Sequence, residues 1–357
     1  MKKLSFYALL IFLTGFLCLF IIEVGLRIVN YSEPKSTWLQ MHDRGFMMNQ
    51  SGGDALHTFN REPFRYTFSD KRTRDEGAFP DAKNILVFGD SFTFGLLLHD
   101  HQTPLFHLNQ IFKASGLTEE FRFVNAGVGG TGLADWVAQL QTSDEFQAFD
   151  GIMIIHNHHD FNRSIYRNLF VLDVDSLLHS MRWRERAIKR WLDNSTLFNW
   201  LQEKSFFVSG LQTFFWTYHF EDVTRGFNPQ TSQVPIPDLS LLVEGSTYPA
   251  DLTKRLYQEL GKLADERGIP IYVTTTGFIK DDFFHSYDRV VFNELAELLS
   301  SLNIPYHDIT PDFFNRIDGD YSSVTIPGDG HPNAEGAALM AELIAAFMLE
   351  QLSAIED

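Results

Sequence analysis

Ser91 occupies a place in the sequence where a serine can act as a nucleophile. It is the third residue of Gly89-Asp90-Ser91-Phe92, directly after the apolar run Asn84–Phe88. A serine between a buried strand and a helix exposes its hydroxyl, and the N-terminus of that helix stabilises negative charge nearby. The backbone N–H of Ser91 can donate to the same oxyanion. The alternative is a turn in which Ser91 only caps the helix.

A base that could activate this serine lies near the C-terminus, in Asp329-Gly330-His331-Pro332-Asn333. A nucleophilic serine needs a base, and the base needs a carboxylate that orients it. Asp329 and His331 can face each other in a loop that contains glycine. His331 would then accept the proton of Ser91, while Asp329 fixes the histidine tautomer. Asn333 is the predicted N-cap of the next helix.

Glycines that allow close approach of a substrate lie in Asn125-Ala126-Gly127-Val128-Gly129-Gly130-Thr131. They let backbone N–H groups point into a site. The alternatives are a plain turn or a nucleotide-binding loop. Gly127, Gly129 and Gly132 have the GxGxxG spacing, which alone is a weak signal, and no GxxxxGK[ST] motif occurs in the sequence, which argues against a phosphate-binding loop of that type.

A fourth polar segment is His156-Asn157-His158-His159-Asp160. Its composition would suit a metal ion. However, adjacent imidazoles rarely all face one ion, and the sequence has no HExxH motif. We therefore expect side chains here to donate hydrogen bonds to an oxyanion, with no metal or organic cofactor.

Predicted strands and helices alternate along the chain, which indicates βαβ units and a mostly parallel sheet covered on both faces. The apolar runs predict strands at Asn84–Phe88, Phe121–Asn125, Gly151–His156, Ile269–Thr274 and Ile304–His307. Periodic segments predict helices at Thr103–Ser115, Leu133–Gln141, Asp251–Arg267, Asp288–Leu302 and Ala334–Leu352. Ligands of such sheets bind beyond the carboxyl ends of the strands, where the polar segments should converge.

The N-terminal segment is predicted to anchor the protein in a membrane. Leu4–Ile22 has no charged side chain and is long enough to span a bilayer as a helix. Lys2 and Lys3 precede it, so the N-terminus should stay cytoplasmic and the rest should be extracytoplasmic. A cleaved signal peptide is the alternative, but Glu23–Arg27 is a poor cleavage site. The only cysteine, Cys18, lies in this segment, which excludes an intramolecular disulfide.

The chain thus divides into an anchor at 1–30, a stalk and irregular lead-in at 31–80, and a catalytic domain at 81–357. One short strand is possible at Phe64–Phe68. Residues 165–250 break the alternation and read as a helical insertion. Its basic cluster, Arg182–Arg190, is typical of a solvated helix face; the alternative is a contact with anionic headgroups or an acidic polysaccharide.

Composition bounds the function further. The chain has 357 residues, with 29 Lys and Arg against 46 Asp and Glu, and a net charge of -17. This acidity argues against a nucleic-acid partner, because phosphate neutralisation needs a cationic face. With 44% hydrophobic and 14% aromatic residues the chain can form a packed core.

In this order, the four polar segments resemble the SGNH hydrolases, also called the GDSL family, over roughly residues 81–350. The resemblance implies a three-layer α/β/α, flavodoxin-like fold with a mostly parallel sheet of about five strands. It makes Ser91 the nucleophile and places the oxyanion glycine on Gly130. The last block of the family resembles Asp329–His331.

The chain departs from the family pattern in two places. The family's third block is Gly-x-Asn-Asp, whose asparagine falls on His159 and whose glycine falls on Asn157. The third oxyanion donor is therefore His159 by position or Asn157 by chemistry. The family's usual last block is Asp-x-x-His, and Gly328 occupies that aspartate position.

The resemblance implies a serine esterase that forms an acyl-enzyme with a small-molecule or carbohydrate ester, here an O-acetyl ester. An alternative is an O-acetyltransferase for an extracytoplasmic polysaccharide, which would need a membrane partner to supply the acyl group. A third possibility is a catalytically inert carbohydrate-binding or assembly subunit.

Overall fold

The computed structural model describes residues 2–29, 38–74, 81–116, 121–142, 149–167, 169–173, 175, 177–180, 195–211, 247–279 and 286–356. The chain folds as two compact units. One comprises Met1–Trp38, Ala55–Phe64 and Glu185–Gly226, and the other comprises the remaining residues.

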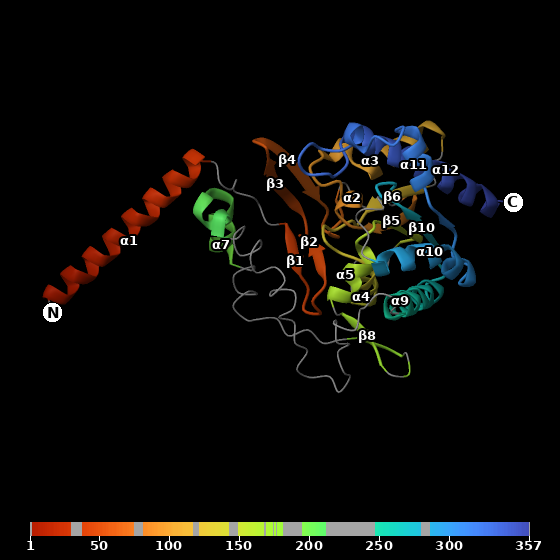
Figure 1. Cartoon of the computed structure of the whole chain (residues 1–357), viewed down its shortest axis with the longest axis horizontal. Coiled ribbons are helices and arrows are strands. Elements are labelled where there is room, and N and C mark those ends of the chain that lie inside the picture. Colours follow the sequence, from red (N-terminus) through yellow and green to blue (C-terminus); the bar gives the residue numbers. More distant parts are fainter. Residues whose placement is uncertain are drawn as a thin grey trace. The chain divides into compact units, whose positions relative to one another are not determined.

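The larger unit is built on a five-stranded sheet with the order β11-β10-β7-β5-β6 (Figure 1). Every neighbouring pair in it is parallel. The strands are β5 (Lys83–Gly89), β6 (Phe121–Asn125), β7 (Gly151–His156), β10 (Ile271–Thr275) and β11 (Tyr306–His307). This confirms the predicted α/β class and the mostly parallel sheet.

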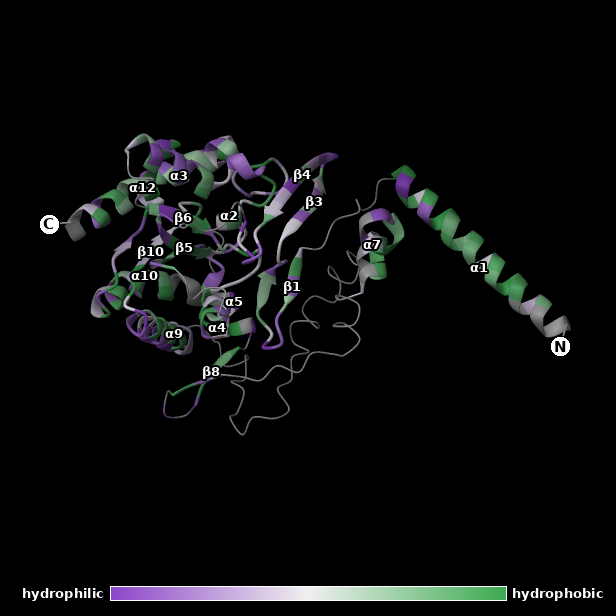
Figure 2. Ribbon diagram, turned by 180° about the vertical axis from the view of Figure 1, so that it is seen from behind, coloured by the Kyte–Doolittle hydropathy of each residue, from purple (hydrophilic) through white to green (hydrophobic). Residues whose placement is uncertain are grey.

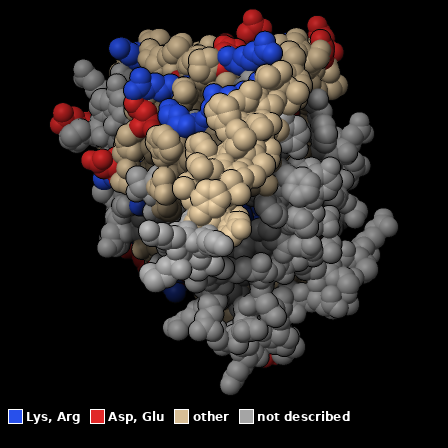
Figure 3. Space-filling model, turned by 90° about the vertical axis from the view of Figure 1, so that its left-hand side faces the viewer, with Lys and Arg blue, Asp and Glu red and all other residues tan. Residues whose placement is uncertain are grey.

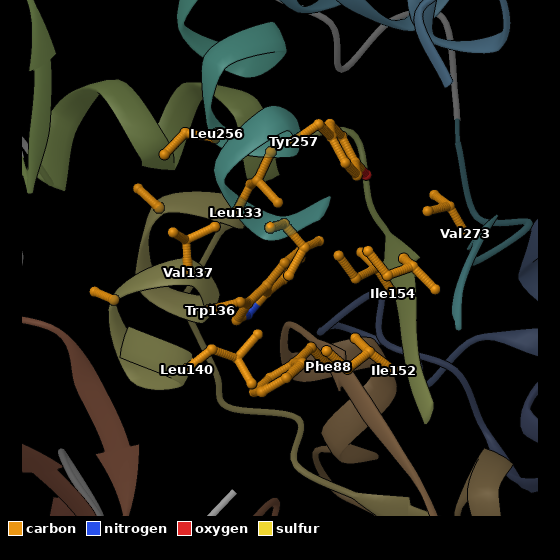
Figure 4. Packing of buried hydrophobic residues seen from close by; sticks show 14 of the residues in the cluster. Phe88, Leu133, Trp136, Val137, Leu140, Ile152, Ile154, Leu256, Tyr257 and Val273 are labelled. Atoms are coloured by element: carbon orange, nitrogen blue, oxygen red, sulfur yellow. The ribbon is translucent and has the colours of Figure 1, made fainter. Parts of the chain in front are cut away.

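Helices cover both faces of this sheet. One face packs on α4 (Leu133–Thr142), α5 (Asp160–Arg167), α9 (Tyr248–Asp265) and α10 (Ser286–Ser301). Its core includes Phe88, Ile152 and Ile154 from the strands and Trp136 from α4 (Figure 4). The other face packs on α3 (Pro104–Ala114), α11 (Thr310–Arg316) and α12 (Ala334–Glu356).

The alternating direction of the side chains along each strand explains why the sheet has a core on each face. Leu86 and Phe88 belong to the first core, whereas Ile85 and Val87 belong to the second. Successive side chains of a strand point to opposite faces, so a continuous apolar run is buried on both. The result is the three-layer α/β/α arrangement that the sequence predicted.

The predicted irregular lead-in contains more structure than expected. It holds two two-stranded sheets, formed by β1 (Leu39–Met41) with β2 (Met47–Asn49) and by β3 (Gly53–Phe59) with β4 (Glu62–Phe68). In β4, Phe64, Tyr66 and Phe68 are buried and the residues between them are exposed. That alternation is a strand signal extending beyond the single short strand expected there.

The described parts of the predicted helical insertion include strands as well as helices. An antiparallel pair is formed by β8 (Phe170–Leu172) and β9 (Leu178–Ser180). Further along lie α7 (Thr196–Lys204) and a short helix at residues 206–211. The basic cluster Arg182–Arg190 lies outside the described residues.

Helix α1 (Lys2–Val29) is a candidate membrane anchor or signal sequence. Its segment Leu9–Val29 has a mean hydropathy of 2.6, and none of it is buried in the protein. Figure 2 shows hydrophobic residues along its length, and Figure 3 shows a continuous patch of uncharged side chains (tan) among the described residues. Ala334–Ser353 in α12 is also apolar, but half of it is buried and its side chains belong to the second core.

Candidate active site

Ser91 begins the short helix α2 (Ser91–Phe94), directly beyond strand β5. The side chain of Asp90 caps this helix by accepting the Phe92 N–H at 2.8 Å. The alternative in which Ser91 serves as the cap is therefore wrong, and its hydroxyl is available for other contacts. The turn is tight: a Cβ on Gly89 would lie 2.0 Å from Thr93 Oγ1, so a side chain there would collide with the helix.

The structure brings Ser91, His331 and Asp329 together. Ser91 Oγ lies 2.8 Å from His331 Nε2. On the other side of the imidazole, Nδ1 is hydrogen-bonded to Asp329 Oδ1. Between the two loop residues Gly330 has φ of +93°, a conformation that favours glycine. This turn lets an aspartate only two residues before the histidine reach its ring.

Packing and backbone hydrogen bonds fix the position of His331. The Ile326 N–H donates to the His331 carbonyl at 2.8 Å, which closes the loop. The ring of Phe92 lies 4.9 Å from the His331 ring, and Phe278 lies 5.5 Å beyond Phe92. The side chains of His331 and Asp329 are 19% and 21% exposed, so solvent reaches the base.

The glycine turn after β6 lies against the nucleophile. A Cβ on Gly127 would lie 2.5 Å from the Phe94 backbone nitrogen, so this position requires glycine. A Cβ on Gly129 would lie 3.8 Å from Ser91 Cβ. Gly130 follows with φ of +74°, and its carbonyl accepts a 2.9 Å hydrogen bond from Arg167. Gly130 thus directly follows the glycine that faces Ser91, and its role as an oxyanion donor stays a prediction.

Asn157 lies at the same edge of the sheet as Ser91, and its side-chain amide has a donor without a partner among the described residues. In the β5–β7 register Gly89 pairs with Ile155, and Ser91 and Asn157 each lie two residues further on. Asn157 is fully buried, and its Nδ2 has no hydrogen-bond partner among the described residues. Its backbone N–H donates to Asp160 Oδ2 at 2.7 Å. His159, the other candidate, is partly exposed, and its ring lies 3.8 Å from that of His158.

We predict that Asn157→Ala lowers kcat on an activated ester about 10²- to 10³-fold, as loss of one oxyanion donor does. We expect His159→Ala to lower it less than about tenfold, because the buried donor at 157 is retained. Steady-state kinetics of both variants show which of the two side chains is the third oxyanion donor. The opposite order would assign the third donor to His159.

The sequence analysis missed a buried ionic cluster behind Ser91. Arg163 Nη1 donates to Asp90 Oδ2 at 2.7 Å and to Asp160 Oδ1 at 3.1 Å. Both carboxyl groups are fully buried. Burial, together with the nearby charge of Asp90, raises the pKa of Asp160 well above its usual range. Arg163 thus links Asp90, which precedes the nucleophile, to Asp160, which accepts the backbone N–H of Asn157. In the sequence, the signal for this ion pair was the three-residue spacing between Asp160 and Arg163, which brings two side chains together on a helix.

The histidines of the 156–160 segment do not face a common point. His156 is fully buried in β7, and its Nε2 shares a 2.5 Å hydrogen bond with the Tyr257 hydroxyl. Burial lowers the pKa of His156 to about 3, so the ring is neutral at physiological pH. Within the described ranges, no group of three or more His, Cys, Asp or Glu side chains is arranged to hold a metal ion.

A second arginine that the sequence analysis missed, Arg74, supports the far end of α2. Its side chain is 1% exposed and donates to the carbonyls of Phe94 at 2.6 Å, Gly95 at 2.5 Å and Leu98 at 2.5 Å. It also pairs with Asp100 at 3.1 Å. Because Phe94 is the last residue of the helix that carries Ser91 and Gly95 is its C-cap, Arg74 fixes the C-terminal end of that helix.

Arg74→Ala should therefore destabilise the fold strongly, by about 3 kcal/mol or more, since it leaves buried carbonyls without donors. Denaturant unfolding measures this change. Arg65→Ala is the matched control: Arg65 also pairs with an aspartate, Asp54, but its side chain is 70% exposed. Exposed pairs contribute little, so the unfolding midpoint of this variant should stay near wild type. Equal effects of the two substitutions would contradict the structural role of Arg74.

Several solved structures resemble this chain at low TM-scores. The psychrotrophic esterase EstA from Pseudoalteromonas sp. is 12% identical, with a TM-score of 0.43 over 76% of this chain and 99% of that chain. TesA is 13% identical, with a TM-score of 0.42 over 74% and 98%. The acetyl xylan esterase AlAXEase is 13% identical, with a TM-score of 0.41 over 74% and 98%. No family model and no curated protein match the chain.

Proposed function

We propose that this chain is a serine-dependent ester hydrolase of the SGNH type. The observation that carries the proposal is the connected set of hydrogen bonds from Ser91 Oγ to His331 Nε2, at 2.8 Å, and from His331 Nδ1 to Asp329. A hydroxyl on a base, with that base on a carboxylate, is the arrangement that activates a serine.

In the proposed reaction Ser91 Oγ attacks the ester carbonyl while His331 Nε2 takes its proton. Asp329 stabilises the imidazolium that forms. The tetrahedral oxyanion is held by the N–H groups of Ser91 and Gly130 and by Asn157 or His159. As the intermediate collapses, the C–O bond to the alcohol breaks and His331 protonates the departing oxygen. Water, activated by the same histidine, then releases the acid and restores Ser91.

We further propose a short acyl group, with O-acetyl esters as the substrate class. Ser91 is only 8% exposed, and a Cβ on Gly129 would lie 3.8 Å from Ser91 Cβ. Phe92 lies beside the base, and Phe278 packs against Phe92. These contacts near the nucleophile favour a short acyl chain.

The experiment is to treat the folded protein with a fluorophosphonate probe and to assay aryl esters of increasing acyl length. We expect covalent labelling and fastest hydrolysis of the acetate. A protein that is neither labelled nor active would instead be the inert binding subunit. Formation of a new ester on an added polysaccharide, without release of acetate, would identify an acetyltransferase.

We also propose that α1 is retained as a single-pass anchor with the catalytic unit extracytoplasmic. The exposed apolar segment Leu9–Val29 and the preceding Lys2 and Lys3 support this orientation. Protease protection on sealed inner-membrane vesicles tests it. Digestion of the catalytic unit from the cytoplasmic side would reverse the orientation.

A further inference from the structure

Two charged side chains in the last turns of α1, Glu23 and Arg27, form hydrogen bonds with other groups of the protein. Glu23 is the first acidic residue of the chain and lies inside the apolar segment Leu9–Val29. Its carboxylate accepts hydrogen bonds from Ser205 Oγ at 2.7 Å, from the Phe206 N–H at 3.0 Å and from the Phe207 N–H at 2.9 Å. Glu23 thus caps the start of the short helix at residues 206–211.

Arg27, one turn later, holds the end of the preceding helix. Its Nη2 donates to the Lys204 carbonyl at 2.7 Å, where α7 ends, and its Nε pairs with Glu23 at 2.8 Å. The Arg27 guanidinium also lies 5.1 Å from the centre of the Phe206 ring. The bend between the two helices is therefore bound to α1 by a carboxylate on one side and a guanidinium on the other.

These contacts fix where the bend can lie if α1 spans a bilayer. Glu23 precedes Val29 by roughly 9 Å at ~1.5 Å per residue, which places it near the boundary of the hydrocarbon. A charged carboxylate there is costly unless it is paired. The N–H donors of residues 206 and 207 and the Arg27 guanidinium supply that pairing, so the bend must lie at the same depth as Glu23.

The side of α7 that these contacts leave exposed suits a lipid surface. Leu197 and Trp200 are 66% and 55% exposed, and Lys204 follows at a spacing that puts all three on one face. Leu211 in the next helix is 42% exposed. Tryptophan is favoured at the membrane interface, and lysine can extend its amine to the headgroups from there. Five basic residues between 182 and 190 precede this element in the sequence.

We propose that residues 195–211 form a second membrane-binding element, lying in the lipid interface beside the anchor and held there by Glu23 and Arg27. The occupant of the exposed Leu197–Trp200 face is the bilayer itself. The inference rests on the proposed membrane anchor and is independent of the catalytic proposal.

The test is nitroxide labelling of the full chain in nanodiscs that contain anionic lipid. Single cysteines are introduced at 197 and 200 in a Cys18→Ser background, as L197C and W200C. F314C is the matched control, because Phe314 is an apolar side chain of the catalytic unit that is 49% exposed. We expect labels at 197 and 200 to be more accessible to oxygen than to a water-soluble nickel chelate, and the label at 314 to show the reverse.

Labelling native Cys18 separates the two proposals, because it lies in the apolar segment and is exposed. If Cys18 is deep in the bilayer while positions 197 and 200 behave like 314, the interfacial element is overturned and the anchor stands. If Cys18 is aqueous, both fail. Glu23→Leu should shift the label at 200 toward water and leave Cys18 deep. An unchanged depth at 200 would contradict the role of Glu23.

Discussion

Ser91→Ala is expected to lower kcat/KM on aryl acetates about 10⁴- to 10⁶-fold, the loss seen when the nucleophile of a Ser-His-Asp site is removed. The oxygen that would form the acyl-enzyme is gone, and with it the 2.8 Å contact between the Ser91 hydroxyl and His331 Nε2. Steady-state kinetics measure the loss. Fluorophosphonate labelling should disappear in parallel.

The same substitution should leave the fold intact. The cap of helix α2 is the Asp90 side chain rather than the Ser91 hydroxyl, so removing that hydroxyl does not remove the cap. The thermal midpoint of the variant should therefore match that of the wild type. An enzyme that keeps activity within about tenfold of wild type, at an unchanged midpoint, would exclude Ser91 as the nucleophile.

Much of the central fold could be predicted because its signals are local. The runs that form β5 and β7 are apolar at successive positions, which is typical of a strand buried on both faces. The parallel order then places the loops after Phe88, Asn125 and His156 at one edge of the sheet. Ser91 and Asn157 follow directly from this edge.

The supporting arginines could not be predicted in the same way. Arg74 binds backbone carbonyls at and after the end of α2, twenty or more residues further along the chain. Every residue has such a carbonyl, so the residue types do not indicate which ones an arginine binds. Arg163 pairs with Asp90, 73 residues away, across two different strand ends. A charged residue in a sequence is expected to be exposed, and only the tertiary structure shows that Arg74 is 1% exposed and Arg163 is 25% exposed.

The choice between Asn157 and His159 illustrates the same limit. Alignment of the third block favours His159, because His159 occupies the position of the family's oxyanion asparagine. The structure supplies two other observations. In the strand register, Asn157 lies two residues after Ile155, as Ser91 lies two residues after the paired Gly89. The buried side-chain amide of Asn157 also has a donor without a partner among the described residues. These two observations are the reason we expect the larger kinetic effect at position 157.

Asp329→Asn is the second substitution expected to have a very large effect, on the order of a 10⁴-fold loss of kcat. The carboxylate accepts a hydrogen bond from the His331 Nδ1–H, which keeps Nε2 unprotonated and able to take the proton of Ser91. An asparagine amide can donate to Nδ1 and so stabilise the opposite tautomer, whose Nε2 already carries a proton. We expect kcat to fall with little change in KM, since the group touches the base and not the substrate.

A second histidine–aspartate pair supplies the control for this substitution. His179 Nε2 lies 2.7 Å from Asp173 Oδ2, with exposed fractions of 38% and 21%, and it is bonded to neither Ser91 nor His331. Asp173→Asn removes the same charge from a comparable pair and should leave kcat unchanged. If Asp329→Asn also left kcat within tenfold of wild type, the short Asp-x-His loop would not orient the base, and the last block would act through His331 alone.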